Sequence, residues 1–344
     1  MAYQVCNKCI LDTNIPYINF NNDGVCNICV DHQKALTGEP IKDYERLEKK
    51  FAKLVKTNNK KIKYDCLCLY SGGKDSTNML YNLVKKHNLK VLAFTLDNWF
   101  LSKQTYSNIN KVLSKLNIDH IIFKPSWNLT ESLFKSGIYK TGNSKEAQKM
   151  SFLIGHVCWP CFVMISIFSI KTALEKNIPN IIVGTTPGQL TQKESTLLSK
   201  YSGITDVYKK MILPFLKILD NDEKYYLNLS LGEKLKSLKL KLVPFYEYHR
   251  YCEEDVFKTV ETEFGWQKPQ DTDSCSSNCS INSLGILIHR KKYNISPYLI
   301  PLAHDVREGL VNREKAMSDT SSVIDENLAR DMAAKLNINC EDIL

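Results

Sequence analysis

Residues 65–78 read Asp-Cys-Leu-Cys-Leu-Tyr-Ser-Gly-Gly-Lys-Asp-Ser-Thr-Asn, a short apolar run followed by a glycine-rich turn and a polar segment. The apolar run predicts a buried strand, and the segment after the turn predicts a helix. Gly72 and Gly73 permit a positive φ and a close backbone approach, so successive amide groups are able to face an anion at the helix N-terminus. Lys74 and Ser76 add a positive charge and a hydroxyl group. The stretch therefore predicts a phosphate-binding turn.

Gly-Gly alone also fits an ordinary strand-to-helix turn, but the complete string over residues 71–76 is more specific. It is not a Walker A loop, which has four residues between its first glycine and Gly-Lys-Ser/Thr. It resembles the fingerprint of the PP-loop superfamily, the N-type ATP pyrophosphatases. The resemblance implies a reaction in which an acceptor oxygen is adenylated and AMP is then displaced by a nucleophile, with Lys74 and Asp75 in catalytic roles. The implied ATP-binding residues of the loop are Ser71, Gly72, Gly73, Lys74, Asp75 and Ser76.

Strand-like and helical segments alternate along the rest of the chain. Further strands are expected at 90–97, 118–124, 180–184 and 240–245. Alternation of this kind predicts an α/β fold with a doubly wound parallel sheet, similar to the PP-loop and related nucleotide-binding folds. Ligands of such a sheet bind at the carboxyl ends of its strands.

Asp97, Gly184 and Thr185 follow two of these strands and are predicted neighbours of the nucleotide, as is Asn98. Asp97 is equally interpretable as a strand-terminating turn residue. Many PP-loop enzymes carry a Gly-His-x-x-Asp-type motif after the fourth strand, whereas this chain has Gly-Thr-Thr-Pro-Gly-Gln at 184–189, without an acidic residue. Asp75 is then the nearest candidate ligand for Mg²⁺.

Twelve cysteines in a chain expected in a reducing compartment indicate metal ligands or catalytic thiols before disulfides. Two Cys-x2-Cys pairs separated by sixteen turn-rich residues open the chain, which is the spacing of a structural Zn²⁺ knuckle. An iron-sulfur cluster or uncoordinated thiols are the alternatives. So short a segment has little core of its own, so metal binding is expected to supply its folding energy. The four predicted ligands are Cys6, Cys9, Cys26 and Cys29.

A second set of cysteines lies far downstream, with Cys158 and Cys161 at the start of an apolar helix and Cys275 and Cys279 after a helix-like segment. A second structural zinc or a thioredoxin-like redox pair are possible interpretations. The combination with the PP-loop is similar to the iron-sulfur-dependent thiolation enzymes that make 2-thiouridine and 2-thiocytidine. That resemblance implies a [4Fe-4S] cluster on Cys158, Cys161 and Cys275, with Cys279 as the rival or fourth ligand. Cys252 reads as a helix start.

The remaining cysteines have structural interpretations. Cys66 and Cys68 lie two positions apart in the first strand, so both point to one face of a sheet covered on both sides and are expected in the core. Cys340 receives no role.

A second resemblance competes for the function. The N-terminus and the segment 306–317 are similar to those of N-acetyl sugar amidotransferases, which use ammonia from a glutaminase partner. Ammonia needs no thiolates, whereas sulfide is stored by something soft, so the downstream cysteines favour an ATP-dependent sulfurtransferase. The implied acceptor is a free nucleotide or nucleobase, or a tRNA, and the sulfur donor is sulfide or a cysteine desulfurase. A non-catalytic nucleotide-binding protein is the third hypothesis.

The composition supports an enzyme with one large core and small appended modules, because 43% of the 344 residues are hydrophobic and 24% are charged. No membrane span or secretory leader is evident, which predicts a cytoplasmic protein, with a homodimer as a possible assembly. The net charge of +9 includes a lysine-rich stretch at 49–63 that is typical of a solvated face and permits an RNA partner.

Three regions are predicted: a four-cysteine zinc-binding module at 1–40, a PP-loop ATP pyrophosphatase domain at 60–270, and a cysteine-containing, helical C-terminal region at 271–344. The polar segments 140–152 and 191–207 are expected to be lids, substrate loops or disordered connections. Residues 300–344 read as a helical tail in which Arg307, Arg313 and Glu314 fit an exposed surface.

Overall fold

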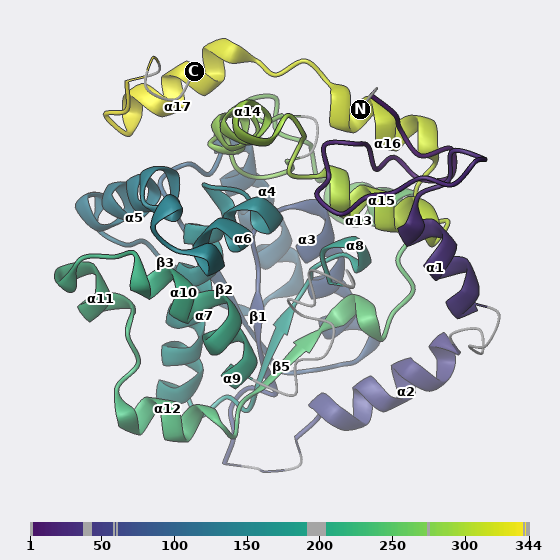
Figure 1. Ribbon diagram of the computed structural model, residues 1–344. Helices are drawn as coiled ribbons and strands as arrows, with labels where there is room; N and C mark the ends of the chain where they lie inside the picture. Colours follow the sequence, from purple (N-terminus) through teal and green to yellow (C-terminus); the bar gives the residue numbers. More distant parts are fainter. Residues whose placement is uncertain are drawn as a thin grey trace.

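The computed structural model describes residues 3–36, 43–57, 59, 61–190, 204–273, 276–339 and 341. Its centre is a five-stranded parallel sheet with the strand order β3-β2-β1-β4-β5 (Figure 1). The strands are β1 (Cys66–Leu69), β2 (Val91–Leu96), β3 (Asp119–Phe123), β4 (Asn180–Val183) and β5 (Lys241–Pro244). Each lies within a segment expected from sequence, and the α/β, doubly wound parallel sheet is confirmed.

Helices cover both faces of the sheet because the strands are apolar on both sides. Cys66 and Cys68 point into one core and Leu67, between them, points into the other. The core containing the two cysteines is completed by α2 (Tyr44–Val55), α3 (Lys74–Tyr81), α4 (Lys103–Leu116) and α13 (Glu253–Phe264). Both thiols are fully buried there, as predicted.

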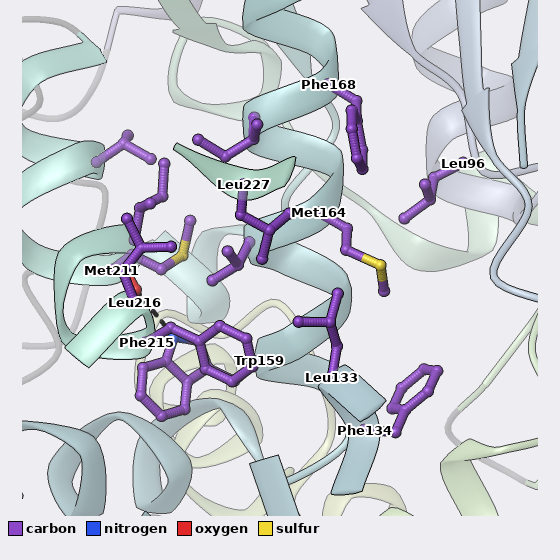
Figure 2. Close-up of a cluster of buried hydrophobic side chains, with 14 of the residues drawn as sticks. Leu96, Leu133, Phe134, Trp159, Met164, Phe168, Met211, Phe215, Leu216 and Leu227 are labelled. Atoms are coloured by element: carbon purple, nitrogen blue, oxygen red, sulfur yellow. Dashed lines mark hydrogen bonds between the residues drawn. The ribbon is translucent and has the colours of Figure 1, made fainter. Parts of the chain in front are cut away.

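The opposite face packs against a larger group of helices that includes α7 (Cys158–Glu175). The others are α5 (Trp127–Tyr139), α6 (Lys145–Ile154), α9 (Ile204–Val207), α10 (Leu213–Lys217), α11 (Asn221–Leu227), α14 (Asn282–Tyr293) and α17 (Glu326–Lys335). Trp159 of α7 is fully buried, and its indole nitrogen donates a hydrogen bond to the Met211 carbonyl at 3.0 Å (Figure 2).

Among the described residues, α7 alone is long and apolar enough to cross a membrane by length and composition. It contacts β1, β2 and β4 along one side and α5, α6, α11 and α12 (Leu231–Ser237) along others. Figure 2 shows Met164 and Phe168 of this helix among buried side chains of the core. This packing is that of a core helix, which passes the same test of length and composition.

The N-terminal cysteines and the C-terminal helices form a third hydrophobic cluster. Figure 1 shows the purple N-terminal segment beside the yellow-green helices α15 (Leu299–Arg307) and α16 (Arg313–Ser321). The cysteine segment contributes Ile10, Leu11 and Ile15, and the C-terminal helices contribute Leu299 and Ala303. The two ends of the chain therefore share one buried core, followed in sequence by α1 (Asn27–Leu36) on the N-terminal side.

Two sequence interpretations need correction. The segment 140–152 is not an irregular connection, because α6 begins at Lys145, capped by the Ser144 hydroxyl, after a short 3₁₀ turn at Thr141–Asn143. Arg313 does more than cover an exposed surface, since its guanidinium donates to the carbonyls of Cys9 and Cys6, both at 2.8 Å. The expected loop at 191–207 lies outside the described residues, apart from α9 at its end.

Candidate functional site

The glycine-rich turn after β1 has a conformation that requires glycine. Gly72 has φ +78°, and a Cβ there would lie 2.8 Å from side-chain carbons of Ile109 and Thr105. Gly73 is the N-cap of α3, and a Cβ there would lie 2.6 Å from the Ser277 hydroxyl. The indole nitrogen of Trp266 donates to the Gly72 carbonyl at 3.0 Å. The turn is thus held in place by Trp266, and neither glycine leaves room for a Cβ.

Two hydroxyl groups close the turn upon itself. Ser76 accepts a hydrogen bond from the Ser71 amide at 3.2 Å, and the two hydroxyl oxygens are 3.0 Å apart. The Ser76 hydroxyl also donates to the Gly73 carbonyl at 3.1 Å. These bonds place the N-terminus of α3, with its partial positive charge, directly behind the loop.

Lys74 points to the side of the turn where α13 begins. Its ammonium nitrogen is 2.9 Å from an Asp75 carboxylate oxygen and 3.3 Å from the Tyr251 hydroxyl. Tyr251 in turn donates to Asp75 at 3.0 Å. Glu253 lies 3.4 Å from the same ammonium group. Burial lowers the pKa of Lys74, but Asp75 and Glu253 outweigh burial and raise it overall, so the side chain is charged.

A cavity of about 360 Å³ opens at the carboxyl ends of the strands, where the fold predicts a ligand. The phosphate-binding turn forms one wall, and the start of α7 and the segment 276–282 form the others. The predicted residues that line it are Ser71, Gly73, Asp75, Ser76, Asn98, Cys158, Cys161, Gly184, Thr185 and Cys279.

Three cysteines from two distant segments meet in this cavity beside the turn. The Cys161 and Cys279 sulfurs both lie within hydrogen-bond range of the Asn98 amide nitrogen, at 3.3 and 3.4 Å. The Cys158 thiol donates to the Asn282 side-chain oxygen at 3.5 Å. Cys275, predicted as the third ligand, lies outside the described residues. The described cysteine that faces Cys158 and Cys161 is the rival, Cys279.

The three thiols are buried enough to resist ionisation on their own. Burial raises the pKa of Cys158 to about 12 and that of Cys279 to about 11, and it raises the pKa of Cys161 well above the usual range. A cation that binds thiolates offsets this cost, because metal coordination displaces the thiol proton. Three soft donors in one low-dielectric cavity therefore fit an iron-sulfur cluster.

The N-terminal cysteines have the geometry of a closed metal site. The Sγ atoms of Cys6 and Cys29 are 3.8 Å apart, as are those of Cys9 and Cys26, and all four lie within 4.8 Å of one another. Four sulfurs about 2.3 Å from one tetrahedral ion are separated by about 3.8 Å, so the set fits Zn²⁺. Backbone amides of Lys8, Cys9, Leu11, Cys26 and Cys29 donate to these sulfurs.

Asp97 lies at the end of β2, but its carboxylate is occupied by protein groups. It accepts from the Tyr106 hydroxyl at 2.5 Å, from the Trp99 amide at 2.8 Å and from Lys124 at 2.9 Å. It is not among the described residues that line the cavity, whereas the next residue, Asn98, is.

An acidic residue reaches the turn after β4 from another part of the chain. Asp305 of α15 is 5% exposed, and a Cβ on Gly188 would lie 2.8 Å from its carboxylate oxygens. Burial raises its pKa, and the neighbouring His304, with Nδ1 3.3 Å from the carboxylate, offsets only part of that rise. Sequence reasoning missed Glu253, Tyr251 and Trp266 at the phosphate-binding turn, and Asp305 at the turn after β4, because only tertiary contacts bring them there.

Comparisons with known proteins give distant similarities. No family model matches the chain. An uncharacterized protein of Methanocaldococcus jannaschii is 25% identical over 295 residues, which span 85% of this chain and 84% of that protein. The U34-tRNA thiolase NcsA from Methanococcus maripaludis, solved with its [4Fe-4S] cluster, is 14% identical, with 99% of this chain and 92% of that chain covered and a TM-score of 0.39.

Two further solved structures each cover 65% of this chain and 94% of their own. They are an NH3-dependent NAD synthetase from Campylobacter jejuni, at 15% identity and a TM-score of 0.32, and an NMN synthetase from Francisella tularensis, at 12% and 0.31. At TM-scores below 0.5, these similarities fix no activity for the chain.

Proposed function

We propose that this chain is an ATP-dependent sulfurtransferase of the PP-loop type. It adenylates a carbonyl oxygen of a nucleobase, in a free nucleotide or a tRNA, and replaces that oxygen with sulfur, releasing AMP and pyrophosphate. The observation that carries the proposal is the convergence of Cys158, Cys161 and Cys279 on the cavity lined by Ser71 and Ser76 of the phosphate-binding turn.

The first step is activation of the acceptor. The carbonyl oxygen attacks the α-phosphate of ATP, and pyrophosphate leaves. The turn from Ser71 to Ser76 holds the phosphates through its amide groups and the N-terminus of α3. Lys74 is charged and adjacent, so it stabilises negative charge that develops on the departing phosphates. A preorganised donor of this kind is worth roughly 3 kcal/mol.

The second step is substitution by sulfur. Three thiolates at Cys158, Cys161 and Cys279 would hold a [4Fe-4S] cluster, which would supply a soft site for hydrosulfide. The chain's own contribution is to hold Cys158, Cys161 and Cys279 in a partly closed cavity next to the activated carbon. Hydrosulfide adds to that carbon and AMP departs with the former carbonyl oxygen. One proton is released, and C=S replaces C=O.

Asp75 and Asp305 are the proposed source of Mg²⁺ ligands, since each lies beside a turn that lines the cavity. The Cys6, Cys9, Cys26 and Cys29 set is proposed to bind structural Zn²⁺ and leaves no open position for chemistry.

The deciding experiment is anaerobic purification followed by metal and acid-labile sulfide analysis with a visible absorption spectrum. The proposal expects about four iron atoms and one zinc per chain, with a broad band in the blue region. A colourless protein that contains zinc alone would instead favour the N-acetyl sugar amidotransferase, which uses ammonia as the nucleophile.

A second groove bears on the size of the acceptor. It has a volume of about 1070 Å³ and lies between the N-terminal module, α6 and α14. All charged side chains among its described lining residues are lysines, Lys145, Lys149 and Lys292, and the aromatic rings of Phe152 and Tyr293 line the same groove. Positive charge beside aromatic rings suits phosphates and bases of single-stranded nucleic acid, which supports a tRNA acceptor over a free nucleotide.

Charge reversal tests the acceptor. We expect Lys145→Glu with Lys149→Glu to weaken binding of a labelled single-stranded RNA at least tenfold, measured by fluorescence anisotropy. Lys236→Glu with Lys239→Glu, two exposed lysines at the end of α12 that do not line the groove, changes the net charge equally and serves as the control. Equal weakening by both pairs would indicate a general charge effect and return the choice to a free nucleotide.

A further inference from the structure

The side-chain amide of Asn98 has one possible orientation. The Phe100 amide N–H donates to Asn98 Oδ1 at 3.0 Å, so Oδ1 is the acceptor end. Nδ2 therefore faces the sulfurs of Cys161 and Cys279 as a donor, at 3.3 and 3.4 Å. Oδ1 lies further from the Cys279 sulfur, at 4.0 Å. One amide group thus donates to two of the three thiols.

The third thiol has the opposite partner. Asn282 Nδ2 donates to an Asp273 carboxylate oxygen at 2.7 Å, which leaves Asn282 Oδ1 facing Cys158 at 3.5 Å. A carboxylate only accepts, so this amide orientation is fixed as well. Cys158 therefore faces a hydrogen-bond acceptor, whereas Cys161 and Cys279 face a hydrogen-bond donor.

The loop that carries Asn98 is fixed on the segment that carries Cys279. Leu101 and Cys279 form an antiparallel bridge, and the Ser280 amide donates to the Phe100 carbonyl at 3.0 Å. The preceding Asp97 accepts from the amide of Trp99, whose φ of +71° turns the chain after β2. Asn98 is 6% exposed. Its position is therefore set by the backbone on both sides of the cavity.

We propose that Asn98 is a positioning residue for the sulfur chemistry. Its amide donates to Cys161 and Cys279 and holds these two sulfurs in place as metal ligands, whereas Cys158 has no such donor from Asn98. The inference rests on the proposed function for its purpose. Its geometry is independent of that function, because every contact involved is within the protein. It assigns to Asn98 a contact with thiols in place of the nucleotide expected from sequence.

Asn98→Asp isolates the donor. The variant keeps the side-chain shape and the oxygen that accepts from Phe100, and it replaces the amide donor with an acceptor of negative charge. Asn278→Asp is the matched control, since it adds the same charge to the same cavity at a residue whose amide faces the Ser71 carbonyl at 3.4 Å. Both are reconstituted anaerobically with iron and sulfide beside the unaltered protein.

We expect Asn98→Asp to retain less iron, or to show a more negative reduction potential where the iron is retained, because hydrogen bonds to ligating sulfur stabilise the reduced state. The control adds charge without removing a donor from sulfur, so it should retain iron like the unaltered protein and lower the potential by less than Asn98→Asp does. Equal iron content and equal potential in Asn98→Asp and the unaltered protein would overturn the role of Asn98.

A second measurement separates this inference from the cluster itself. If the unaltered protein takes up no iron, the cluster in the proposed function is refuted. The role of Asn98 is then tested by the rates at which iodoacetamide alkylates the three thiols, mapped by mass spectrometry. Asn98→Asp should slow Cys161 and Cys279 about tenfold or more relative to Cys158, the internal control. Unchanged relative rates would refute the proposal.

Discussion

The ammonium group of Lys74, on the phosphate-binding turn, lies 3.4 Å from a carboxylate oxygen of Glu253 at the start of α13. Glu253 also forms an ion pair with Lys315 of α16. The Glu253 carboxylate therefore links the phosphate-binding turn to the C-terminal helices. Burial raises the pKa of Glu253, but Lys74 and Lys315 outweigh burial and lower it. Glu253 is therefore ionised and sets the direction in which Lys74 points.

Lys74→Ala should slow pyrophosphate release by about a hundredfold or more, because it removes one preorganised positive charge from the departing phosphates. Lys315→Ala is the matched control, since it removes a lysine from the same carboxylate without touching the turn. Pyrophosphate release and zinc content are measured for both. An unaltered rate in Lys74→Ala would remove this lysine from the mechanism.

Cys279→Ser should lose sulfur transfer and iron while it keeps acceptor-dependent pyrophosphate release. The reason is that Cys279 faces the other two thiols, whereas adenylation depends on the turn. Cys275→Ser and Cys252→Ser serve as comparisons, and both should retain iron. Loss of iron in Cys275→Ser with retention in Cys279→Ser would restore Cys275 as the third ligand.

Removal of metal from the N-terminal module should loosen the C-terminal helices. Arg313 donates to the carbonyls of Cys6 and Cys9, so α16 depends on the cysteine loop keeping its shape. Cys26→Ser, or chelation, should increase hydrogen exchange in α15 and α16 and leave β1 and β2 protected. Uniform protection throughout would show that the module is not held by metal.

Gly72→Ala should destabilise the fold by about 1–3 kcal/mol, because alanine is strained at φ +78°. Its Cβ would also lie 2.8 Å from carbons of Ile109 and Thr105. Gly232→Ala is the control, since nothing lies within 4 Å of a Cβ at that position. Thermal unfolding compares the two, and a Tm for Gly72→Ala equal to that of the control would contradict the strain.

Acid should destabilise the protein through its buried histidines. Burial lowers the pKa of His249 to about 4 and that of His289 to about 3. The folded state therefore favours the neutral imidazoles. Their contribution to the free energy of unfolding is complete above the unfolded pKa of about 6.5 and is lost as the pH falls toward 4. Each should account for about 2 kcal/mol between pH 7 and pH 5.

The hydrogen bond between His87 and His249 provides a direct check of this effect. Their Nε2 atoms are 2.7 Å apart, and His249 Nδ1 donates to the Phe245 carbonyl, so His249 Nε2 is an acceptor that protonation would eliminate. Urea denaturation at pH 7 and pH 5 measures the loss. A His249→Gln variant should show a smaller difference between the two pH values, and an equal difference would argue against this histidine.

The strands were predictable from sequence because each is a short apolar run whose neighbours are polar or glycine-rich, as at Cys66–Leu69. The conformation of the glycine-rich turn at 71–76 was predictable for the same local reason. Its surroundings were not, because Trp266 and Glu253 reach the turn only through tertiary packing, as Asp305 reaches the turn after β4. The helix α6 was not recognised in the sequence because most of its residues are polar. Its buried apolar residues, such as Ala147 and Met150, are too few to show a helical pattern.

Asn98 illustrates the same limit more sharply. Its place after a strand was evident from sequence, but the group that its amide contacts depends on a bridge between Leu101 and Cys279. No local pattern reports such a pairing. The spacing of Cys6, Cys9, Cys26 and Cys29 was informative because a tetrahedral site needs little beyond two close pairs and a turn.

The hydrogen bonds from Arg313 to the Cys6 and Cys9 carbonyls join two segments that are synthesised at different times. A ribosome makes the cysteine loop well before the arginine that braces it and the helix surface that covers it, at Leu299 and Ala303. During that interval the four thiols are exposed to whatever metals and oxidants the nascent chain meets. Capture of the correct ion early in synthesis would therefore protect the first part of the protein until the last part arrives.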